Sequence, residues 1–309
     1  MTLSDCLASG PVFMEGALGE RLKREYGLAA DGPVALAGLV YEERGRSALK
    51  ELWKQYLDIA ERYALPFLAT TPTRRCNQER LALSPYNGAI LGDNLRLLRE
   101  ALAQARVPVF AGGLLGCRGD AYSGQGCLSE AESREFHRWE AEGFRAAGAD
   151  FLLAALMPTL PEALGMAAAL SATGLPFIIS FTLQKDGRLM DGTTLHDSIA
   201  AIDALPGRPP LCYMANCVHP RIVAAALDCP WNQTTAVKTR FLGIQANASD
   251  LSFAELDGAG ELHGSPPAAL AREMSALRER FGLRLFGGCC GTDARHMEAV
   301  ARALRGLSC

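Results

Sequence analysis

The sequence predicts an α/β fold of the TIM-barrel class, a (β/α)8 barrel formed as a single domain by residues 1–309. Short apolar segments recur along the chain, longer amphipathic segments separate them, and the apolar segments number eight. Continuous apolar segments are typical of parallel strands on which helices pack. Eight strand–helix units in 309 residues match the size of a closed barrel, and this length is near the upper limit for one hydrophobic core.

The predicted strands share a run of apolar residues bounded by turn residues. They cover residues 11–18, 65–72, 107–115, 150–157, 176–183, 211–217, 240–247 and 284–291. A doubly wound open sheet is the main alternative, and it should carry a glycine-rich fingerprint after its first strand. Residues 15–21 read EGALGER, which does not match GxGxxG, and the chain has no Walker A motif. The closed barrel is therefore favoured.

The predicted helices repeat apolar residues at helical spacing. They cover residues 47–63, 91–105, 129–147, 267–280 and 292–304. The third of these opens with Ser129, and Glu132 follows three residues later, which is the pattern of a capping box. This pair predicts where that helix begins.

The composition is typical of a soluble globular protein, with 49% hydrophobic and 21% charged residues. A net charge of −3 gives no reason to expect nucleic acid or a membrane surface as a partner. No signal peptide precedes residue 11, and no apolar stretch reaches the ~18 residues of a membrane span. The ten cysteines are therefore expected as reduced thiols in the cytoplasm.

Polar or glycine-rich residues stand at the ends of the predicted strands, where barrel enzymes carry their chemistry. Cys217 ends the sixth predicted strand, and Cys289 and Cys290 end the eighth within the segment GGCCG. One strand separates the two positions in a barrel, and the glycines allow adjacent thiols to turn toward one centre. Three thiolates suit Zn²⁺ and leave a fourth position open, as in catalytic zinc sites. Buried small side chains, or a disulfide or redox pair of adjacent cysteines, are the alternatives.

These residues resemble the homocysteine S-methyltransferase family, with its betaine-, S-methylmethionine- and cobalamin-dependent branches. The resemblance rests on GGCCGT at residues 287–292 and on Asn216-Cys217. The turn EGALG at residues 15–19 is similar to the family's Asp-Gly-Gly-x-Gly turn, and residues 112–122 resemble its Gly-Ser-x-Gly-Pro loop. The order and spacing of these segments span the whole chain.

The resemblance implies a (β/α)8 fold, Zn²⁺ as cofactor, and Cys217, Cys289 and Cys290 as its ligands. It implies that the metal-bound thiol of homocysteine loses its proton and takes a methyl group from a sulfonium or ammonium donor, giving methionine. The partners are then a small thiol acceptor and a methyl donor. S-methylmethionine, S-adenosylmethionine and betaine are the donors expected, because the chain carries no appended cobalamin or folate module. The donor and the oligomeric state, with a homo-oligomer among the options, stay open.

The substrate-binding residues that we predict stand at strand ends. They are Glu15, Gly16, Thr71, Asn216 and Asn247. Glu15 is assigned to the amino group of the acceptor, and it stands where the family usually has Asp. Asn216 and Asn247 either orient substrate or satisfy backbone groups.

Two departures from the family pattern question the identity of the acceptor. Ala155 stands where the family's second carboxylate, which also binds the amino group, usually lies. Arg74 and Arg75 follow the second strand, where the family more often has a Thr-Tyr-Gln pattern. Either Glu15 holds the amino group of homocysteine alone, or the acceptor is another small thiol or selenol with more negative charge near these arginines. A zinc- or thiol-binding barrel without turnover is a third hypothesis.

Several further residues invite a functional role, and a structural one is at least as well supported for each. Arg118 and Asp120 either touch substrate or form a turn salt bridge. His219 precedes Pro220 at the start of a predicted helix and is not expected to bind zinc, and His296 is expected to be structural or solvent-facing. The remaining cysteines are treated as ordinary thiols, with Cys76 and Cys117 the nearest to the barrel mouth. The others are Cys6, Cys127, Cys212, Cys229 and Cys309.

Overall fold

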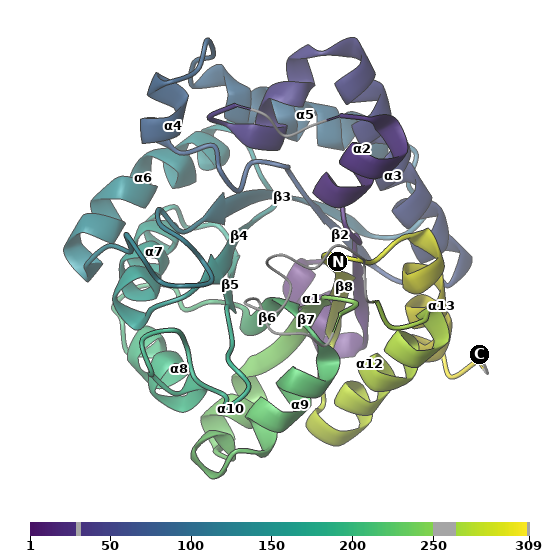
Figure 1. Ribbon diagram of the computed structural model, residues 1–309, viewed down its shortest axis with the longest axis vertical. Helices are drawn as coiled ribbons and strands as arrows, with labels where there is room; N and C mark the ends of the chain where they lie inside the picture. Colours follow the sequence, from purple (N-terminus) through teal and green to yellow (C-terminus); the bar gives the residue numbers. More distant parts are fainter. Residues whose placement is uncertain (29–31, 250–263, 308–309) are drawn as a thin grey trace.

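A computed structural model describes residues 1–28, 32–249 and 264–307, and it confirms the predicted (β/α)8 barrel. Eight parallel strands follow one another in chain order, and β8 pairs with β1 to close the barrel (Figure 1). Each strand overlaps its predicted segment. The strands are β1 (Val12–Met14), β2 (Phe67–Thr70), β3 (Val109–Gly116), β4 (Phe151–Met157), β5 (Phe177–Phe181), β6 (Cys212–Val218), β7 (Phe241–Ala246) and β8 (Leu285–Gly288).

Helices surround the barrel, and all five predicted helices are present (Figure 1). Those of the first half are α1 (Leu3–Ser9), α2 (Gly19–Tyr26), η1 (Ala35–Tyr41), α3 (Glu43–Arg62), α4 (Gln78–Ala82), α5 (Ala89–Leu102) and α6 (Glu130–Ala147). Those of the second half are α7 (Leu160–Ala172), α8 (Leu195–Asp203), α9 (Pro220–Asp228), η2 (Pro230–Asn232), α10 (Thr235–Arg240), α12 (Pro267–Phe281) and α13 (Ala294–Leu304). Among the described residues, no helix is both long and apolar enough to cross a membrane.

The start of α6 follows the predicted capping box. The Glu132 amide donates to the Ser129 hydroxyl, and the Ser129 amide donates to the Glu132 carboxylate. These bonds satisfy two of the amides that a helix start leaves without partners. The helix ends at Gly148, which takes a left-handed conformation with φ 81°.

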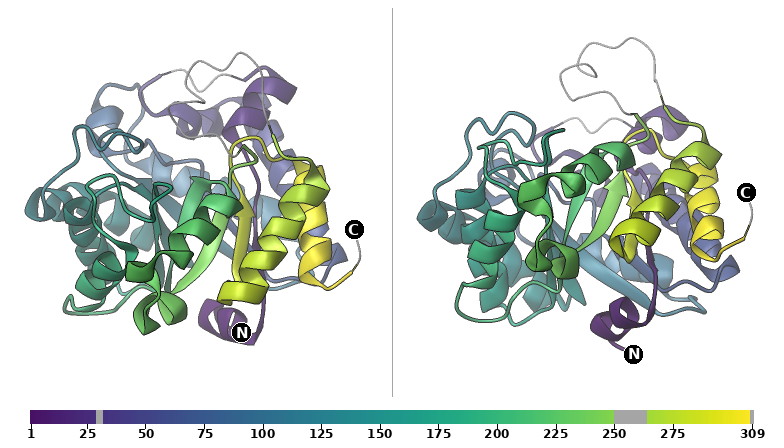
Figure 2. Two further views of the ribbon diagram at one scale, coloured as in Figure 1. Left: turned by 60° about the horizontal axis from the view of Figure 1, so that its bottom comes forward. Right: turned by 90° about the horizontal axis from the view of Figure 1, so that it is seen from below.

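The amino end of the barrel is closed by α1, which lies there in both views of Figure 2. Leu3, Cys6 and Leu7 of α1 pack with residues that point into the barrel, such as Met14 and Phe151. Fully burying an apolar side chain of this size contributes about 1.5–3 kcal/mol. Since apolar side chains fill this end, a ligand can approach only at the carboxyl ends of the strands.

Several strands end earlier than the sequence predicted, and the early end of β8 bears on the cysteines. β8 stops at Gly288, so Cys289 and Cys290 lie in the turn that follows and not at the end of the strand. A Cβ atom at Gly288 would clash with the Thr292 hydroxyl and would lie 2.7 Å from the Met297 sulfur of α13. This close approach requires glycine at the last position of the strand.

Candidate functional site

Three thiols meet at the carboxyl end of the barrel. The Sγ atoms of Cys217, Cys289 and Cys290 all lie within 4.8 Å of one another, and Cys217 Sγ is 3.5 Å from Cys290 Sγ. Cys217 belongs to β6, and the other two follow β8, so the order of the strands brings them together as the sequence predicted. Within the described part of the chain, this is the one group of three or more Cys, His, Asp or Glu side chains close enough to share a metal ion.

The backbone around the thiols explains why they converge. Cys217 adopts a left-handed conformation with φ 59°, and Gly291 does so with φ 76°. The Cys289 amide donates to the Ala246 carbonyl of β7 at 2.7 Å, and the Ala248 amide donates to the Cys290 carbonyl at 2.9 Å. Adjacent side chains of a regular strand would point to opposite faces. The turn after β8, held against the end of β7, removes that constraint.

The cluster favours one thiolate. Hydrogen bonds from Cys289 and Cys290, and then from the Tyr122 hydroxyl, hold the pKa of Cys217 well below its usual range. The same hydrogen bond to Cys217 raises the pKa of Cys289. The Asn247 amide nitrogen lies 3.8 Å from Cys217 Sγ and adds a donor. Polarizable, readily deprotonated sulfur is the ligand chemistry that a soft cation such as Zn²⁺ prefers, and three sulfurs leave room for a fourth ligand.

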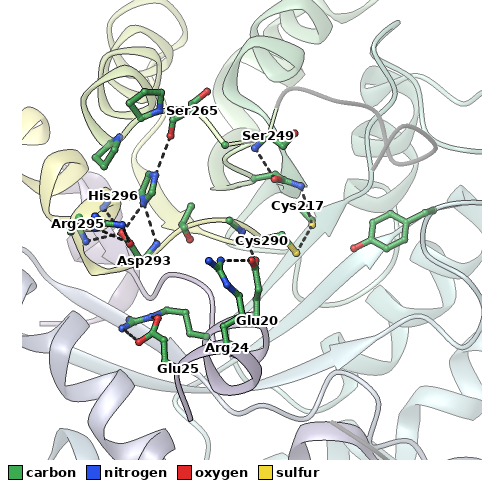
Figure 3. A pocket seen from close by; sticks show the side chains of 18 of the residues that line it. Glu20, Arg24, Glu25, Cys217, Ser249, Ser265, Cys290, Asp293, Arg295 and His296 are labelled. Carbon is green, nitrogen blue, oxygen red and sulfur yellow. Dashed lines mark hydrogen bonds and ion pairs between the residues drawn. The ribbon is translucent and has the colours of Figure 1, made fainter. Parts of the chain in front are cut away.

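Two cavities meet at the thiols. A large cavity of about 1110 Å³ opens between α2, α12, α13 and the loop after β3, and Cys217 and Cys290 line it (Figure 3). A small cavity of about 240 Å³ lies over the ends of β1, β2, β4 and β6, and Cys289 and Cys290 line it. Glu20, Tyr122 and Cys290 border both. The thiols therefore stand at the junction of two compartments, each able to take one substrate.

Glu15 is one of two acidic residues that line the small cavity, and it is only 3% exposed. Its Oε1 accepts hydrogen bonds from the Thr70 amide at 3.0 Å and the Thr70 hydroxyl at 2.6 Å, whereas its Oε2 has no partner among the described residues. Burial raises the pKa of Glu15 to about 7, although the Thr70 hydrogen bonds act in the opposite direction. A buried oxygen without a partner is costly, so Oε2 is suited to a donor supplied by a ligand.

Asn216 also faces the small cavity and is held at its oxygen end. Its Oδ1 accepts from the Leu156 amide at 3.0 Å and from the Ser180 hydroxyl at 2.6 Å. Since a side-chain amide carries its two donors on nitrogen, these two bonds place the oxygen of Asn216 toward protein groups and leave its nitrogen for other partners. Asn216 therefore satisfies backbone groups, as one prediction had it, and can still donate to a ligand.

Thr71 and Gly16 line the small cavity for different reasons. The Thr71 hydroxyl is 2.7 Å from that of Thr73 and accepts from the Leu114 amide at 3.2 Å, so it joins the loop after β2 to strand β3. A Cβ atom at Gly16 would lie 2.7 Å from the Tyr56 hydroxyl, so no larger residue fits there. Both residues shape the wall of the cavity.

The structure separates the predicted substrate-binding residues. Glu15, Gly16, Thr71 and Asn216 line the small cavity, but Asn247 lines the large one. These five residues were predicted as one set, because strand ends alone do not reveal how side chains divide a barrel mouth.

The residues that depart from the family pattern also lie in different places. Arg74 and Ala155 line the small cavity, whereas Arg75 is exposed and lines neither. Arg118 points to solvent and pairs with Glu79 of α4 at 3.1 Å, so the turn salt bridge that was predicted between Arg118 and Asp120 does not form.

Asp120 has a structural role in its own turn and also borders a cavity. Its carboxylate accepts from the amides of Tyr122 and Ser123 at 2.7 and 2.9 Å, so it stabilises its own turn. It also lines the large cavity.

Two residues that lie beside the thiols were not predicted as site residues. Tyr122 packs against Cys217 and Cys289. Glu20 accepts from the Gly291 amide at 2.6 Å and pairs with Arg24 at 3.0 Å (Figure 3). Glu20 lies only five residues after Glu15, which is the one signal that could have placed it near the site. Tyr122 stands in a loop whose path the sequence does not fix.

Neither His219 nor His296 lies within the group of thiols that could share a metal ion. His219 begins α9, as predicted, and its Nε2 lies 3.1 Å from the Ser265 hydroxyl. His296 takes part in the cap of α13 with Asp293 and lies 3.1 Å from the Ser265 carbonyl (Figure 3). It lines the large cavity and is 8% exposed, so the structural prediction was right and the solvent-facing one wrong.

The other cysteines behave as separate thiols. Cys117 packs beside the cluster, as predicted for the mouth. Cys76 is fully buried, and burial raises its pKa to about 12. Cys6 and Cys212 belong to the barrel interior, and Cys309 lies outside the described residues.

A (β/α)8 barrel with three convergent thiols at the junction of two cavities defines the class of protein. The family model described as homocysteine S-methyltransferase matches residues 12–304. The chain therefore belongs to the homocysteine S-methyltransferase family, a family of methyl-transferring enzymes.

Known relatives agree with this assignment. Homocysteine S-methyltransferase of Escherichia coli strain K12 is 28% identical over 69% of this chain and 70% of its own length. Homocysteine S-methyltransferase 4 of Zea mays is 24% identical over 60% of this chain, and the match spans only 54% of the maize protein.

The solved structure of the E. coli homocysteine methyltransferase MmuM shares the fold. Its oxidized form superposes with a TM-score of 0.77 at 22% identity, covering 95% of this chain and 96% of MmuM. Its metallated form gives a TM-score of 0.75 and covers 96% and 98%.

Proposed function

We propose that the protein is a zinc-dependent S-methyltransferase that moves a methyl group from a small sulfonium or ammonium donor to the thiol of homocysteine, forming methionine. The observation that carries the proposal is the convergence of three thiols where two cavities meet. The names of the E. coli and maize relatives support homocysteine as acceptor. The metallated form of MmuM supports a metal in this fold.

Cys217, Cys289 and Cys290 would hold the zinc ion. Bound there with one position open, zinc would lower the pKa of a substrate thiol and keep it as a nucleophilic thiolate. Two contacts fix the turn that carries Cys289 and Cys290. The Gly291 amide donates a hydrogen bond to the Glu20 carboxylate, and the Cys289 amide donates one to the end of β7. Such outer contacts fix the orientation of metal ligands.

The small cavity would bind the acceptor. Glu15 Oε2, buried and without a partner among the described residues, is suited to accept from the acceptor's amino group. The Asn216 amide can donate to the acceptor from the opposite side of the cavity mouth, because its oxygen is already bonded to Leu156 and Ser180. Thr71 and Gly16 provide the wall.

The large cavity would bind the methyl donor, and Asn247 is part of its lining. The acceptor sulfur forms a bond to the methyl carbon while the bond from that carbon to the donor's sulfur or nitrogen breaks. The cationic donor leaves as a neutral thioether or amine. The protein contributes by orienting the two substrates, which can lower the barrier by several kcal/mol. A volume of about 1110 Å³ accommodates S-methylmethionine, S-adenosylmethionine or betaine.

The proposal is tested by metal content and activity together. Wild type, Cys290→Ala and the control Cys229→Ala, which lies in the surface turn after α9, are prepared with zinc under reducing conditions. Each is assayed for zinc and for methylation of homocysteine with the three donors. We expect wild type and Cys229→Ala to bind one zinc and turn over, and Cys290→Ala to lose both properties. Equal zinc in all three proteins would contradict the proposed site.

Ala155 in the wall of the small cavity favours a second candidate, methylation of another small thiol or selenol. The same assay with a panel of acceptors separates it from the first. A barrel that binds zinc and thiols without turnover would show binding and no methyl transfer with any donor. The cytoplasmic location and the organisation of residues 1–309 as one domain stay predictions.

A further inference from the structure

Arg74 lies in the wall of the small cavity, in the loop directly after β2. It is half-buried and shares the cavity with Glu15, Asn216 and the thiols of Cys289 and Cys290. Arg74 and two of the three thiols thus border one compartment of about 240 Å³.

The aliphatic part of the Arg74 side chain packs closely against Gly116 at the end of β3. A Cβ atom at Gly116 would lie 2.7 Å from Arg74 Cγ, so the glycine at the end of β3 makes room for the arginine. Packing of the aliphatic stem leaves the charged end as the part that meets the cavity or the solvent.

No side chain or carbonyl of the described residues receives a hydrogen bond or ion pair from Arg74. The arginines of the large cavity differ in this respect. Arg21 pairs with Glu25 at 2.6 Å, Arg24 with Glu20 at 3.0 Å and Arg295 with Asp293 at 2.7 Å. The large cavity thus neutralises its cations internally, and the small cavity leaves one cation available for an anion.

The charges of the small cavity favour a ligand with a carboxylate. Ala155 supplies no second carboxylate for an amino group, and Glu20, the other acidic residue that lines the cavity, already pairs with Arg24 and accepts from the Gly291 amide. Glu15 is therefore the acidic side chain there whose Oε2 has no partner among the described residues. A guanidinium binds a carboxylate with two parallel hydrogen bonds, a geometry that lysine cannot match.

We propose that Arg74 binds the carboxylate of the thiol acceptor and determines its class. The acceptor is a short thiol carboxylic acid, whether or not it also carries an amino group. This inference rests on the proposed function for the identity of the site, and it changes the expected recognition from the amino end of the acceptor to its carboxylate end.

The experiment compares three thiols that differ by one group each. Homocysteine carries both groups, 4-sulfanylbutanoate lacks the amino group, and 3-aminopropane-1-thiol lacks the carboxylate. Their binding to the zinc-loaded protein is measured by isothermal titration calorimetry. We expect 4-sulfanylbutanoate to bind within about tenfold of homocysteine, and the aminothiol to bind about 10- to 100-fold more weakly, the range for a lost charged hydrogen bond.

Three variants assign the effect to Arg74. Arg74→Met should weaken both thiol acids about 10- to 100-fold and leave the aminothiol unchanged. Arg74→Lys should recover part of the affinity, because it keeps the charge without the two-pronged geometry. Arg75→Met, at the exposed neighbour that lines neither cavity, should bind all three thiols as wild type does. In turnover, Arg74→Met should raise KM for thiol acids with kcat largely kept.

The outcomes separate this inference from the proposed function. If wild type ranks the aminothiol above 4-sulfanylbutanoate, or if Arg74→Met binds the thiol acids unchanged, the role of Arg74 is refuted even when homocysteine is methylated. If no donor methylates homocysteine but the thiol acids bind through Arg74, the proposed reaction fails and the inference stands. The order of affinities of the three thiols for the wild-type protein needs no variant. This order therefore remains a decisive test even if Arg74→Met folds poorly.

Discussion

The two sides of the barrel mouth differ in how they are built. On the sulfur side, β6 and the turn after β8 carry the full cysteine pattern of the family, and backbone hydrogen bonds fix it. On the acceptor side, over β1, β2 and β4, three positions depart from the family pattern. They are Glu15, Arg74 and Ala155.

The difference teaches where such a barrel can change. The thiols must converge on one point, so a displacement of any one of them removes the site. The acceptor side is a wall of side chains from different strands and loops, and Glu15, Arg74 and Ala155 can each be replaced while the strands stay in place. Under the proposed function, the sulfur side would set the reaction type and the acceptor side would set the choice of acceptor.

The largest effect is expected from removing one sulfur. Cys289→Ser should reduce zinc affinity by more than the roughly 10- to 100-fold that changes outside the ligand shell cost, and should abolish methyl transfer. Zinc content after dialysis against a weak chelator measures it. Cys117→Ser is the matched control, because Cys117 packs beside the cluster without belonging to it. Similar zinc loss in both variants would mean that the sulfur side is not defined by its three thiols.

On the acceptor side, Glu15 should make stability depend on pH. Burial raises its pKa from 4.5 to about 7, so the folded protein holds this proton more tightly than the unfolded chain. Stability from this group is therefore full below about pH 4.5 and falls by about 3 kcal/mol as pH rises through 7. Urea unfolding of the metal-free, reduced protein between pH 4.5 and 7.5 measures it.

Glu15→Gln is the control for that measurement, since it keeps the shape and cannot ionise. The difference in unfolding free energy between the two proteins should carry the pH dependence. An identical pH profile for both proteins would show that Glu15 is not the group responsible.

An intermediate effect is expected at Glu20, which supports the sulfur side from α2. Glu20→Gln should weaken zinc binding by roughly tenfold, because the charged acceptor of the Gly291 amide is lost. Arg24→Gln removes only the exposed partner of Glu20 and should have little effect, as surface ion pairs contribute about 0–1 kcal/mol. Competition with a chromogenic chelator compares them. Equal losses would place the effect in the ion pair rather than in the turn.

The smallest effect is expected at Ser180, which holds Asn216 on the acceptor side. Ser180→Ala should cost about 1 kcal/mol of stability and raise the acceptor KM a few-fold, because one of two bonds to Asn216 Oδ1 is lost. Ser198→Ala, at a buried serine whose hydroxyl donates to the Thr194 carbonyl in α8, should cost a similar amount without changing KM. A KM shift in both variants would indicate a general loosening and no specific support of Asn216.

Local patterns predicted most of the fold because they are short-range. The apolar segments located all eight strands, and Ser129 with Glu132 located the start of α6. The meeting of Cys217 with Cys289 and Cys290 was also predictable, because strand order in a closed barrel is chain order.

The misses have a common cause. β8 was expected to reach Gly291 but ends at Gly288, and the turn that follows is hydrogen-bonded to the end of β7 and to Ala248. Asn247 was predicted in one set with Glu15, Gly16, Thr71 and Asn216, but it lines the large cavity and they line the small one. Both depend on contacts between segments far apart in the chain.

By itself, the sequence determined the barrel, the order of its strands and helices, and the three sulfurs at its carboxyl end, because periodicity and residue chemistry are local properties of a sequence. Only the tertiary structure decided that two cavities meet at those sulfurs, that Glu20 and Tyr122 border them, and that Arg74 but not Arg75 faces the small cavity. These are properties of space enclosed between loops, and the direction of a loop is set by the neighbours against which it packs.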